Sequence, residues 1–320
     1  MDRSRQSVLL KKRLYKAGGG LLRTIFLLGV GYVTLYPMLL MISSSFMSAS
    51  DTLDATVVWL PSGFNWFNFQ KAFELMKNDP TARALVSIGS TGAVLAGAVL
   101  RVGRIKGVKR PAFCPILPTV QNGLVAICDS GANVDCDPIY LQQFAVMGSL
   151  YMQKAYGVEN PRVALLNIGA ESEKGNELAK NTYPLLQETK SINFVGNMEG
   201  REVLDGNVDV VVCDGFDGNI LLKSTEGACL NMLKLVKRAF MANLVSKMGA
   251  LLLKKEVMKL KGLMDYNNYG GAVLLGANKT IVKGHGSSKA EAVYQCIKQA
   301  FNMENNNLCE AIRQAIAEQN

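Results

Sequence analysis

The stretch Leu124-Val-Ala-Ile-Cys-Asp-Ser-Gly-Ala-Asn133 joins a run of apolar residues to a polar loop that contains glycine. The same change recurs in Arg162-Val-Ala-Leu-Leu-Asn-Ile-Gly169 and in Val208-Asp-Val-Val-Val-Cys-Asp-Gly-Phe-Asp-Gly-Asn219. A short continuous apolar run is typical of a strand that is buried on both faces. Helical stretches separate these strands, so the pattern predicts an α/β fold of three layers, with helices on both faces of a largely parallel sheet.

The flanking sequence repeats this alternation. Further strands are expected at residues 84–88, 193–195, 272–275 and 280–283. Between two strands, Asp137 and Pro138 form a helix start and Gly157 a helix end, because aspartate caps, proline fits the first turn and glycine ends helices. The pattern therefore extends from about Ala82 to the end of the chain.

Six of the predicted strands end in loops rich in Gly, Asn, Asp, Ser and Thr. Ligands of such sheets bind outside the carboxyl ends of the strands, where helix N-termini offer free N–H groups to anions. One such loop alone is more often only a tight turn. Six loops on one rim favour a binding site for an anionic substrate.

Several common chemistries lack their motifs here. The chain has no Gly-x-Gly-x-x-Gly after its first strand, no phosphate-binding P-loop and no Gly-x-Ser-x-Gly elbow. Its seven cysteines include no Cys-x-x-Cys pair, and His285 is the single histidine. We therefore expect no cofactor, no metal and no covalent triad, and we interpret the cysteines as reduced thiols.

The first part of the chain is different. Residues 1–23 carry seven of the 35 basic side chains and contribute +6 to the net charge of +9. The positive net charge of the chain is therefore weak evidence for nucleic-acid binding, and we expect no nucleic-acid partner.

Residues 24–42 carry no charge and are long enough to cross a bilayer, although Pro37 would kink the helix. The alternative is a cleaved signal peptide, with Ser48-Ala49-Ser50 as the cleavage site. The length of the apolar run favours a retained span with its N-terminus in the cytoplasm.

Residues 1–78 resemble the start of a sugar-type ABC transporter permease, through the basic arm, the Tyr36-Pro37 step and the segment from Leu60-Pro61-Ser62 to Phe73. Such permeases have several further spans, and no second convincing span follows here, so transport by this chain alone is not expected. The change of pattern near Asp79 and Pro80 predicts two domains: residues 1–79, with the arm, the span and the permease-like loop, and residues 80–320.

The second domain carries a series of motifs in a fixed order. They are Ser87-Ile-Gly-Ser-Thr-Gly-Ala93, Gly103-Arg-Ile-Lys-Gly107, Asp129-Ser-Gly-Ala-Asn-Val-Asp-Cys136, Gln143-Phe-Ala-Val-Met-Gly148, Lys174-Gly-Asn-Glu-Leu178, Gly196-Asn-Met-Glu-Gly-Arg201, Val212-Cys-Asp-Gly-Phe-Asp-Gly-Asn219, Tyr269-Gly-Gly-Ala272 and His285-Gly-Ser-Ser288. Together, over about residues 82–302, they resemble the bacterial phosphate acyltransferase of phospholipid synthesis, the acyl-carrier-protein:phosphate acyltransferase.

The resemblance implies a reaction and its partners. Family members move a long acyl chain from acyl carrier protein to inorganic phosphate, and a membrane acyltransferase consumes the acyl phosphate. It also implies a cytoplasmic homodimer with a fold like those of phosphotransacetylases and isopropylmalate dehydrogenase. Relatives begin with a further strand and a Met-Gly-Gly-Asp-type turn where this chain has residues 1–79, so we expect an N-terminally truncated enzyme domain.

Lys174 and Asn219 are the residues expected to act in transfer. Phosphate is a nucleophile and a thioester has a good leaving group, so the protein must hold a dianion and stabilise an oxyanion. The Lys174 ammonium suits phosphate, and its alternative role is a solvated charge in Glu171-Ser-Glu-Lys174. The Asn219 amide suits a carbonyl oxygen, and its alternative role is a helix N-cap, which is compatible with the first.

The neighbouring loops supply the expected substrate contacts. Asp129, Asn133 and Asp135 are expected to shape their loop through Asx turns, and His285 to cap the following helix or to donate to phosphate. The residues assigned to substrate and phosphate binding are Ser90, Thr91, Gly92, Asn133, Asn176, Gly218, His285 and Ser287.

Two basic segments are candidate contact surfaces. The first is a strip that we expect to dock the acidic carrier protein, with a solvated loop as an equal alternative: Arg101, Arg104, Lys106, Lys109 and Arg110. The second is the amphipathic stretch 244–262, which fits a dimer-forming hairpin, a membrane-surface helix, or both, with residues 248–253 as a lipid-contacting tip.

Two classes of function remain open from the sequence. The first is acyl transfer from carrier protein to phosphate. The second is a membrane-anchored or permease-derived chimera without catalysis.

Overall fold

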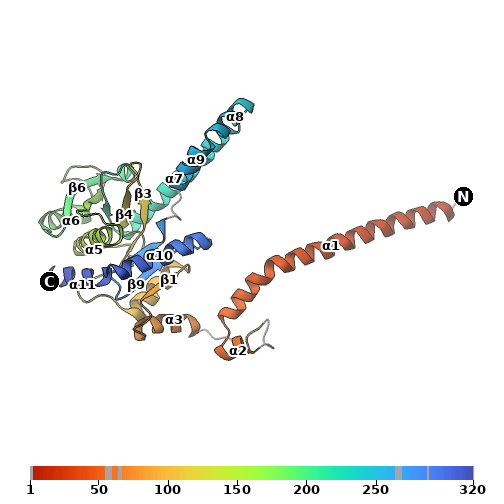
Figure 1. Cartoon of the computed structure of the whole chain (residues 1–320), viewed down its shortest axis with the longest axis horizontal. Coiled ribbons are helices and arrows are strands. Elements are labelled where there is room, and N and C mark those ends of the chain that lie inside the picture. Colours follow the sequence, from red (N-terminus) through yellow and green to blue (C-terminus); the bar gives the residue numbers. More distant parts are fainter. Residues whose placement is uncertain (1–2, 55–59, 64–66, 264–268, 287, 320) are drawn as a thin grey trace. The chain divides into compact units, whose positions relative to one another are not determined.

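The computed structural model describes residues 3–54, 60–63, 67–263, 269–286 and 288–319 (Figure 1). The chain forms two compact units, Met1–Ala72 and Phe73–Asn320. The predicted permease-like loop lies partly outside the described residues, as does Ser287.

The first unit is built on one long helix. Helix α1 runs from Arg3 to Ser45 and contains Pro37, and the short helix α2 (Ala49–Leu53) begins at a capping box between Ser48 and Asp51. The part of α1 from Arg23 to Ser45 has a mean hydropathy of 2.1 and none of it is buried, so its length and composition suffice to cross a membrane. No other helix of the described residues meets that test.

The described residues of the second unit form nine strands in two sheets, rather than the one sheet that the sequence led us to expect. The first sheet has the order β1-β9-β8-β2, and the second has the order β3-β4-β7-β5-β6. In chain order the strands are β1 (Ala84–Ser87), β2 (Ala112–Cys114), β3 (Ile116–Pro118), β4 (Leu124–Cys128), β5 (Arg162–Asn167), β6 (Asn193–Glu199), β7 (Val210–Val212), β8 (Ala272–Leu275) and β9 (Thr280–Lys283).

The pairing within the sheets is mixed. Strands β4, β7, β5 and β6 are parallel neighbours, and β1 is parallel to β9, whereas the pairs β2·β8, β8·β9 and β3·β4 are antiparallel. Strands β2 and β3 are separated by Pro115 alone, so one extended segment leaves the first sheet and enters the second. Residues 112–118 therefore join the two halves of this unit.

Each sheet is covered on both faces, which confirms the predicted three-layer α/β class. In the second sheet, alternate residues of β4 and β7 face opposite clusters: Ala126, Val210 and Val212 lie with helix α5 (Pro138–Tyr156), and Val125 and Val211 lie with Leu222 of helix α7. In the first sheet, helices α10 (Ala290–Asn305) and α11 (Leu308–Gln319) contribute to one cluster, and helices α3 (Phe67–Asn78) and α4 (Thr91–Gly97) to the other.

The end of α3 packs into this second unit. Met76 is buried, and Phe73 lies so close to Gly97 that a β-carbon there would be 2.4 Å from the ring. Glu74 forms an ion pair of 3.7 Å with Arg101. Residues 73–78 therefore belong to the hydrophobic core of the second unit.

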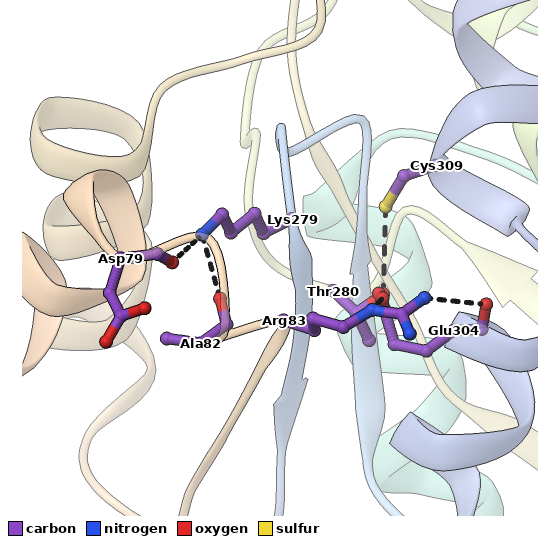
Figure 2. Close-up of polar contacts among 7 residues, drawn as sticks. All are labelled: Asp79, Ala82, Arg83, Lys279, Thr280, Glu304 and Cys309. Carbon is purple, nitrogen blue, oxygen red and sulfur yellow. Dashed lines mark hydrogen bonds and ion pairs between the residues drawn. The ribbon is translucent and has the colours of Figure 1, made fainter.

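The turn after α3 is fastened to strand β9 and helix α10 (Figure 2). The ammonium of Lys279 donates to the carbonyl oxygens of Asp79 and Ala82, at 2.8 Å each. The guanidinium of Arg83 lies 3.0 Å from the carboxylate of Glu304. These bonds fix the entry of the chain into β1.

The remaining helices include a projection. Helix α7 (Gly215–Phe240) leads into α8 (Leu244–Leu252) and α9 (Lys254–Leu263), and α8 lies far from both sheets (Figure 1). Leu244, Met248, Leu251 and Leu252 of α8 are each at least 70% exposed. The predicted amphipathic segment is thus helical and presents apolar side chains to solvent.

Candidate active site

The carboxyl ends of four parallel strands form one rim of the second sheet. The loops that follow β4, β5, β6 and β7 lie along it, because these strands all run in the same direction. The loops after β1 and β9 lie along the corresponding edge of the first sheet. The six polar loops therefore divide into groups of four and two.

Asp129 organises the loop after β4. Its carboxylate is fully buried and accepts hydrogen bonds from the backbone N–H groups of Phe113, Ser130, Ala132 and Asn133 at 2.7–3.2 Å. Burial raises the pKa of Asp129, and these bonds act in the opposite direction. Asp129 thus shapes the loop, by bonds that reach as far back as strand β2.

Asn133 links the same loop to its neighbours. Its side-chain amide donates to the carbonyl oxygen of Pro111 at 2.8 Å and to Asp129 at 3.0 Å. Its own carbonyl accepts from the backbone N–H of Gly215 at 2.7 Å. Asn133 therefore joins the loop after β4 to Pro111, next to the basic strip, on one side and to α7 on the other.

The glycines of the Asp214-Gly-Phe-Asp-Gly-Asn219 motif allow α7 to begin directly on this loop. A β-carbon at Gly215 would lie 2.6 Å from the carbonyl oxygen of Asn133, and one at Gly218 would lie 1.9 Å from that of Asp129. The carboxylate of Asp214 caps the helix by accepting from the N–H of Asp217 at 2.8 Å. Burial raises the pKa of Asp214.

Helix α7 separates two cavities. Asp217, Ile220, Leu221 and Ser224 line a cavity of about 590 Å³ that reaches the loop after β5, whereas Leu222, Lys223 and Glu226 line one of about 90 Å³ beside β9. Residues three and four apart share a helix face, so the two sets lie on different faces of α7. The larger cavity is lined on its apolar side by Leu141, Leu165, Leu166, Ile168, Leu178, Ala179, Ile220 and Leu221, and on its polar side by Asn167, Asn176, Asp214, Asp217 and Ser224.

Lys174 lies on the loop that borders the larger cavity. Its side chain is exposed, and its carbonyl oxygen accepts from the amide of Asn167 at 3.0 Å. Gly175 and Asn176 line the cavity, and the Asn176 side chain caps helix α6 (Glu177–Glu188) by accepting from the N–H of Ala179 at 2.8 Å. The Lys174 ammonium has no hydrogen bond or ion pair among the described residues.

Asn219 lies one turn into α7 and is exposed. A β-carbon at Gly131 would lie 3.8 Å from its side chain, so Asn219 borders the loop after β4. Asp214, not Asn219, is the N-cap of the helix. Within the described part of the chain no bond joins Asn219 to Lys174, so the two could act together only on a shared substrate.

The predicted contacts from the first sheet lie at two places. Ser90 caps α4 by accepting from the N–H of Ala93, and Gly92 lines a cavity of about 370 Å³ with Asn133. His285 is exposed and lines the small cavity beside β9.

All five cations of the basic strip are exposed. Arg101 is paired with Glu74, the guanidinium of Arg104 donates to the carbonyl oxygen of Lys109, and that of Arg110 lies 5.9 Å from the ring centre of Tyr140. Arg104 and Arg110 also line the cavity of Gly92 and Asn133, beside the apolar side chains of Leu95, Val99 and Leu100.

Lys283 lines a cavity but was not among the site residues expected from the sequence. It is half-buried at the end of β9 and lines the small cavity together with Lys223 and Glu226 of α7. Its position directly before Gly284 and His285, at the end of a buried strand, is a signal that could have identified it. Lys223 and Glu226 carried no such signal, because a helix in isolation does not show which of its faces borders a cavity.

The thiols of Cys128, Cys136 and Cys213 are poor nucleophiles in this state. Burial raises the pKa of Cys136 to about 12, and it raises the pKa values of Cys128 and Cys213 well above the ordinary value. Thiolates are therefore rare near neutral pH.

Sequence comparisons place the chain among known proteins. A family model described as "Fatty acid synthesis protein" matches residues 70–311. The phosphate acyltransferase of Clostridioides difficile (strain 630) is 47% identical over 249 residues, which are 78% of this chain and 73% of the relative. The phosphate acyltransferase of Bacillus subtilis (strain 168) is 46% identical over 238 residues, which are 74% and 72% of the two chains.

Solved structures share the fold. A phosphotransacetylase from Streptococcus pyogenes superimposes with a TM-score of 0.51 at 16% identity, covering 74% of this chain and 68% of that one. A branched-chain phosphotransacylase from Enterococcus faecalis V583 gives a TM-score of 0.50 at 15% identity, with coverages of 79% and 85%. At these identities the likeness concerns the fold alone.

Proposed function

The chain belongs to the phosphate acyltransferase family of acyltransferases, and on that premise we propose that it transfers a long acyl chain from acyl carrier protein to inorganic phosphate. One observation carries the proposal: an aliphatic cavity of about 590 Å³ opens at a rim of polar loops, between the loop of Lys174 and the first turns of α7. Aliphatic walls suit a fatty acyl chain, and the polar rim suits its thioester and an anion.

The proposed roles follow from this placement. Asn219 donates its amide to the carbonyl oxygen of the thioester, where negative charge develops during attack by phosphate. Lys174 offsets the charge of the phosphoryl group at the mouth of the cavity. The proposed substrate contacts remain Ser90, Thr91, Gly92, Asn133, Asn176, Gly218, His285 and Ser287.

Release of free carrier protein from acylated carrier in the presence of phosphate tests this function on the full chain in detergent. We expect Lys174→Ala and Asn219→Ala each to lower the rate by ~10²–10³, the usual effect of losing one such charge-stabilising group. Lys180→Ala and Asn207→Ala, two exposed positions outside the loops of the site, serve as controls. A parent chain without phosphate-dependent release would favour the non-catalytic alternative, and a variant within about twofold of the parent would remove that residue from the mechanism.

We also propose that the basic strip docks the carrier protein. Its five cations include Lys106 and Lys109, whose side chains have no ion pair among the described residues, and the strip borders the cavity of Gly92 and Asn133. Charge reversal at Arg104 and Lys106 should raise the KM for acyl carrier protein, most strongly at low salt. A salt-independent, unchanged KM would speak for a solvated loop.

The organisation of the chain is a further part of the proposal. We propose two domains, residues 1–79 and 80–320, with the first derived from a permease-like segment and anchoring a cytoplasmic enzyme domain through residues 24–42. The exposed apolar helix and the start of the family match at residue 70 support this organisation. The packing of Met76 supports including the end of α3 in the enzyme core. We further propose a homodimer that contacts the membrane surface through α8 and passes acyl phosphate to a membrane acyltransferase.

A further inference from the structure

The cavity of about 90 Å³ beside β9 lies where the two halves of the second unit meet. Its walls come from the connecting segment at Pro115, from Lys283 and His285 at the end of β9, and from Lys223 and Glu226 of α7. Its volume is far smaller than that of the aliphatic cavity, so it suits a small ion rather than an acyl chain.

The wall of this cavity at Gly271 is held by hydrogen bonds to a buried side chain of α10. The buried side chain of Gln299 accepts from the N–H of Gly271 at 2.9 Å and donates to the carbonyl oxygen of Gly271 at 3.2 Å. Its amide also donates to the hydroxyl of Tyr151 at 2.6 Å. A β-carbon at Gly271 would lie 2.5 Å from the carbonyl oxygen of Lys283, so the wall and the end of β9 are in direct contact.

The charges in the cavity do not balance. The ammonium of Lys223 is paired with Glu226 at 2.7 Å, which leaves the half-buried Lys283 without an ion pair or hydrogen bond for its ammonium among the described residues. Burial and the charge of Lys223 lower the pKa of Lys283, and the charge of Glu226 acts in the opposite direction. A partly buried cation beside a second cation is stabilised by an anion bound between them.

The cavity also adjoins the residue proposed to bind the thioester. Asn219, Lys223 and Glu226 are spaced four and three residues apart on α7, so they share one face of the helix. Asn219 is therefore about 6 Å along the helix axis from Lys223, at about 1.5 Å per residue.

We propose that Lys283 and Lys223 hold the inorganic phosphate before transfer, on the opposite side of α7 from the aliphatic cavity, and that Lys174 meets this phosphate only when it reaches the thioester. This inference rests on the proposed function. Hydrogen phosphate attacks the thioester carbonyl, a phosphate oxygen forms the new bond to carbon and the carbon–sulfur bond breaks. The departing thiolate takes the proton of the hydrogen phosphate, so the products are acyl phosphate and free carrier thiol.

Direct binding of inorganic phosphate tests the site independently of transfer. Isothermal titration of the full chain in detergent, with sodium phosphate as the probe, should show saturable binding. Lys283→Met and Lys223→Met should each weaken it at least tenfold, whereas Lys283→Arg should retain it because the charge is kept. Lys237→Met, an exposed position further along α7, should bind like the parent.

The outcomes separate the site from the function. Saturable binding that Lys283→Met removes, without any transfer by the parent, would leave the site standing and defeat the proposed function. Four results would overturn the phosphate site. The first three are no saturable binding by the parent, equal binding by Lys283→Met, and a loss of binding in Lys174→Ala alone. The fourth is a rise in the KM of Lys283→Met for acyl carrier protein with its KM for phosphate unchanged, which would assign the cavity to the carrier's phosphodiester.

Discussion

Gly218 is the residue at which α7 approaches the loop of Asp129 most closely. A methyl group there would overlap the carbonyl oxygen of Asp129, so Gly218→Ala should destabilise the protein by about 1–3 kcal/mol or more. Gly227 lies in the same helix with open space around it, and Gly227→Ala should stabilise by about 0.5–1 kcal/mol. Urea unfolding of both variants measures the difference, and equal effects would mean that α7 does not sit on the loop as described.

The buried thiols give a second prediction for single residues. A raised pKa means that the thiolate is disfavoured, so alkylation of Cys136 by iodoacetamide should stay slow at pH 8 and rise only as the pH approaches 12. Cys128 and Cys213 should behave in the same way. Mass spectrometry after native and denaturing alkylation compares each cysteine with itself, and fast native labelling of Cys136 would contradict its burial.

At the scale of single residues, motifs in the sequence identified candidate residues, but they did not show which other residues these contact. Asp129 was expected to shape its loop through local turns, and the structure adds a bond to Phe113, which is remote in sequence. Lys283 was missed because its importance comes from Lys223, which lies on a helix 60 residues earlier. Contacts of this kind depend on how the elements pack, and a motif carries no information about that.

At the scale of elements, the strands themselves were largely predictable. Residues 272–275 and 280–283 form strands with the expected bounds, and α5 starts at Pro138 and is capped at its C-terminus by Gly157 in the left-handed conformation. The division into two sheets was not predictable. It arises at β2 and β3, two strands of three residues on either side of Pro115, which are too short for a pattern to identify.

Lys279 provides a test of how the chain enters β1. Its ammonium holds the carbonyl oxygens of Asp79 and Ala82 (Figure 2), and hydrogen bonds to a charged group contribute about 1.5–3 kcal/mol. Lys279→Met should therefore lower the free energy of unfolding by about that amount and expose residues 78–83 to proteases. Lys298→Met, on the exposed side of α10, should change neither. Unchanged proteolysis of Lys279→Met would mean that the turn is held by other contacts.

Helix α8 can be tested as a membrane contact. Leu251 and Leu252 are 72% and 86% exposed, and the lysines of α9 follow them. A fragment of residues 67–320, which keeps α3 and lacks the apolar part of α1, should float with anionic liposomes. Leu251→Glu combined with Leu252→Glu should abolish flotation, and Met232→Glu on α7 should not. Equal flotation of the double variant would assign this surface to a dimer contact.

At the scale of the whole chain, the apolar part of α1 is a feature that none of the cavities explains. With 23 residues and none of them fully buried, it should keep the full protein in the membrane pellet during alkaline carbonate extraction. Leu28→Lys together with Val33→Lys should release the chain, because two charges at mid-span are costly in hydrocarbon. Release of the parent would mean that α1 does not insert.

The length of helix α7 sets the distance between its two ends. It runs without interruption from Gly215 to Phe240, which is about 39 Å at about 1.5 Å per residue. The surface that α8 contacts is thereby kept at a nearly constant distance from the loop of Asp129. An acyl chain that leaves the rim for that surface must be shielded from water over this distance. It could be carried by a protein that receives it, or pass along the exposed apolar side chains of α7.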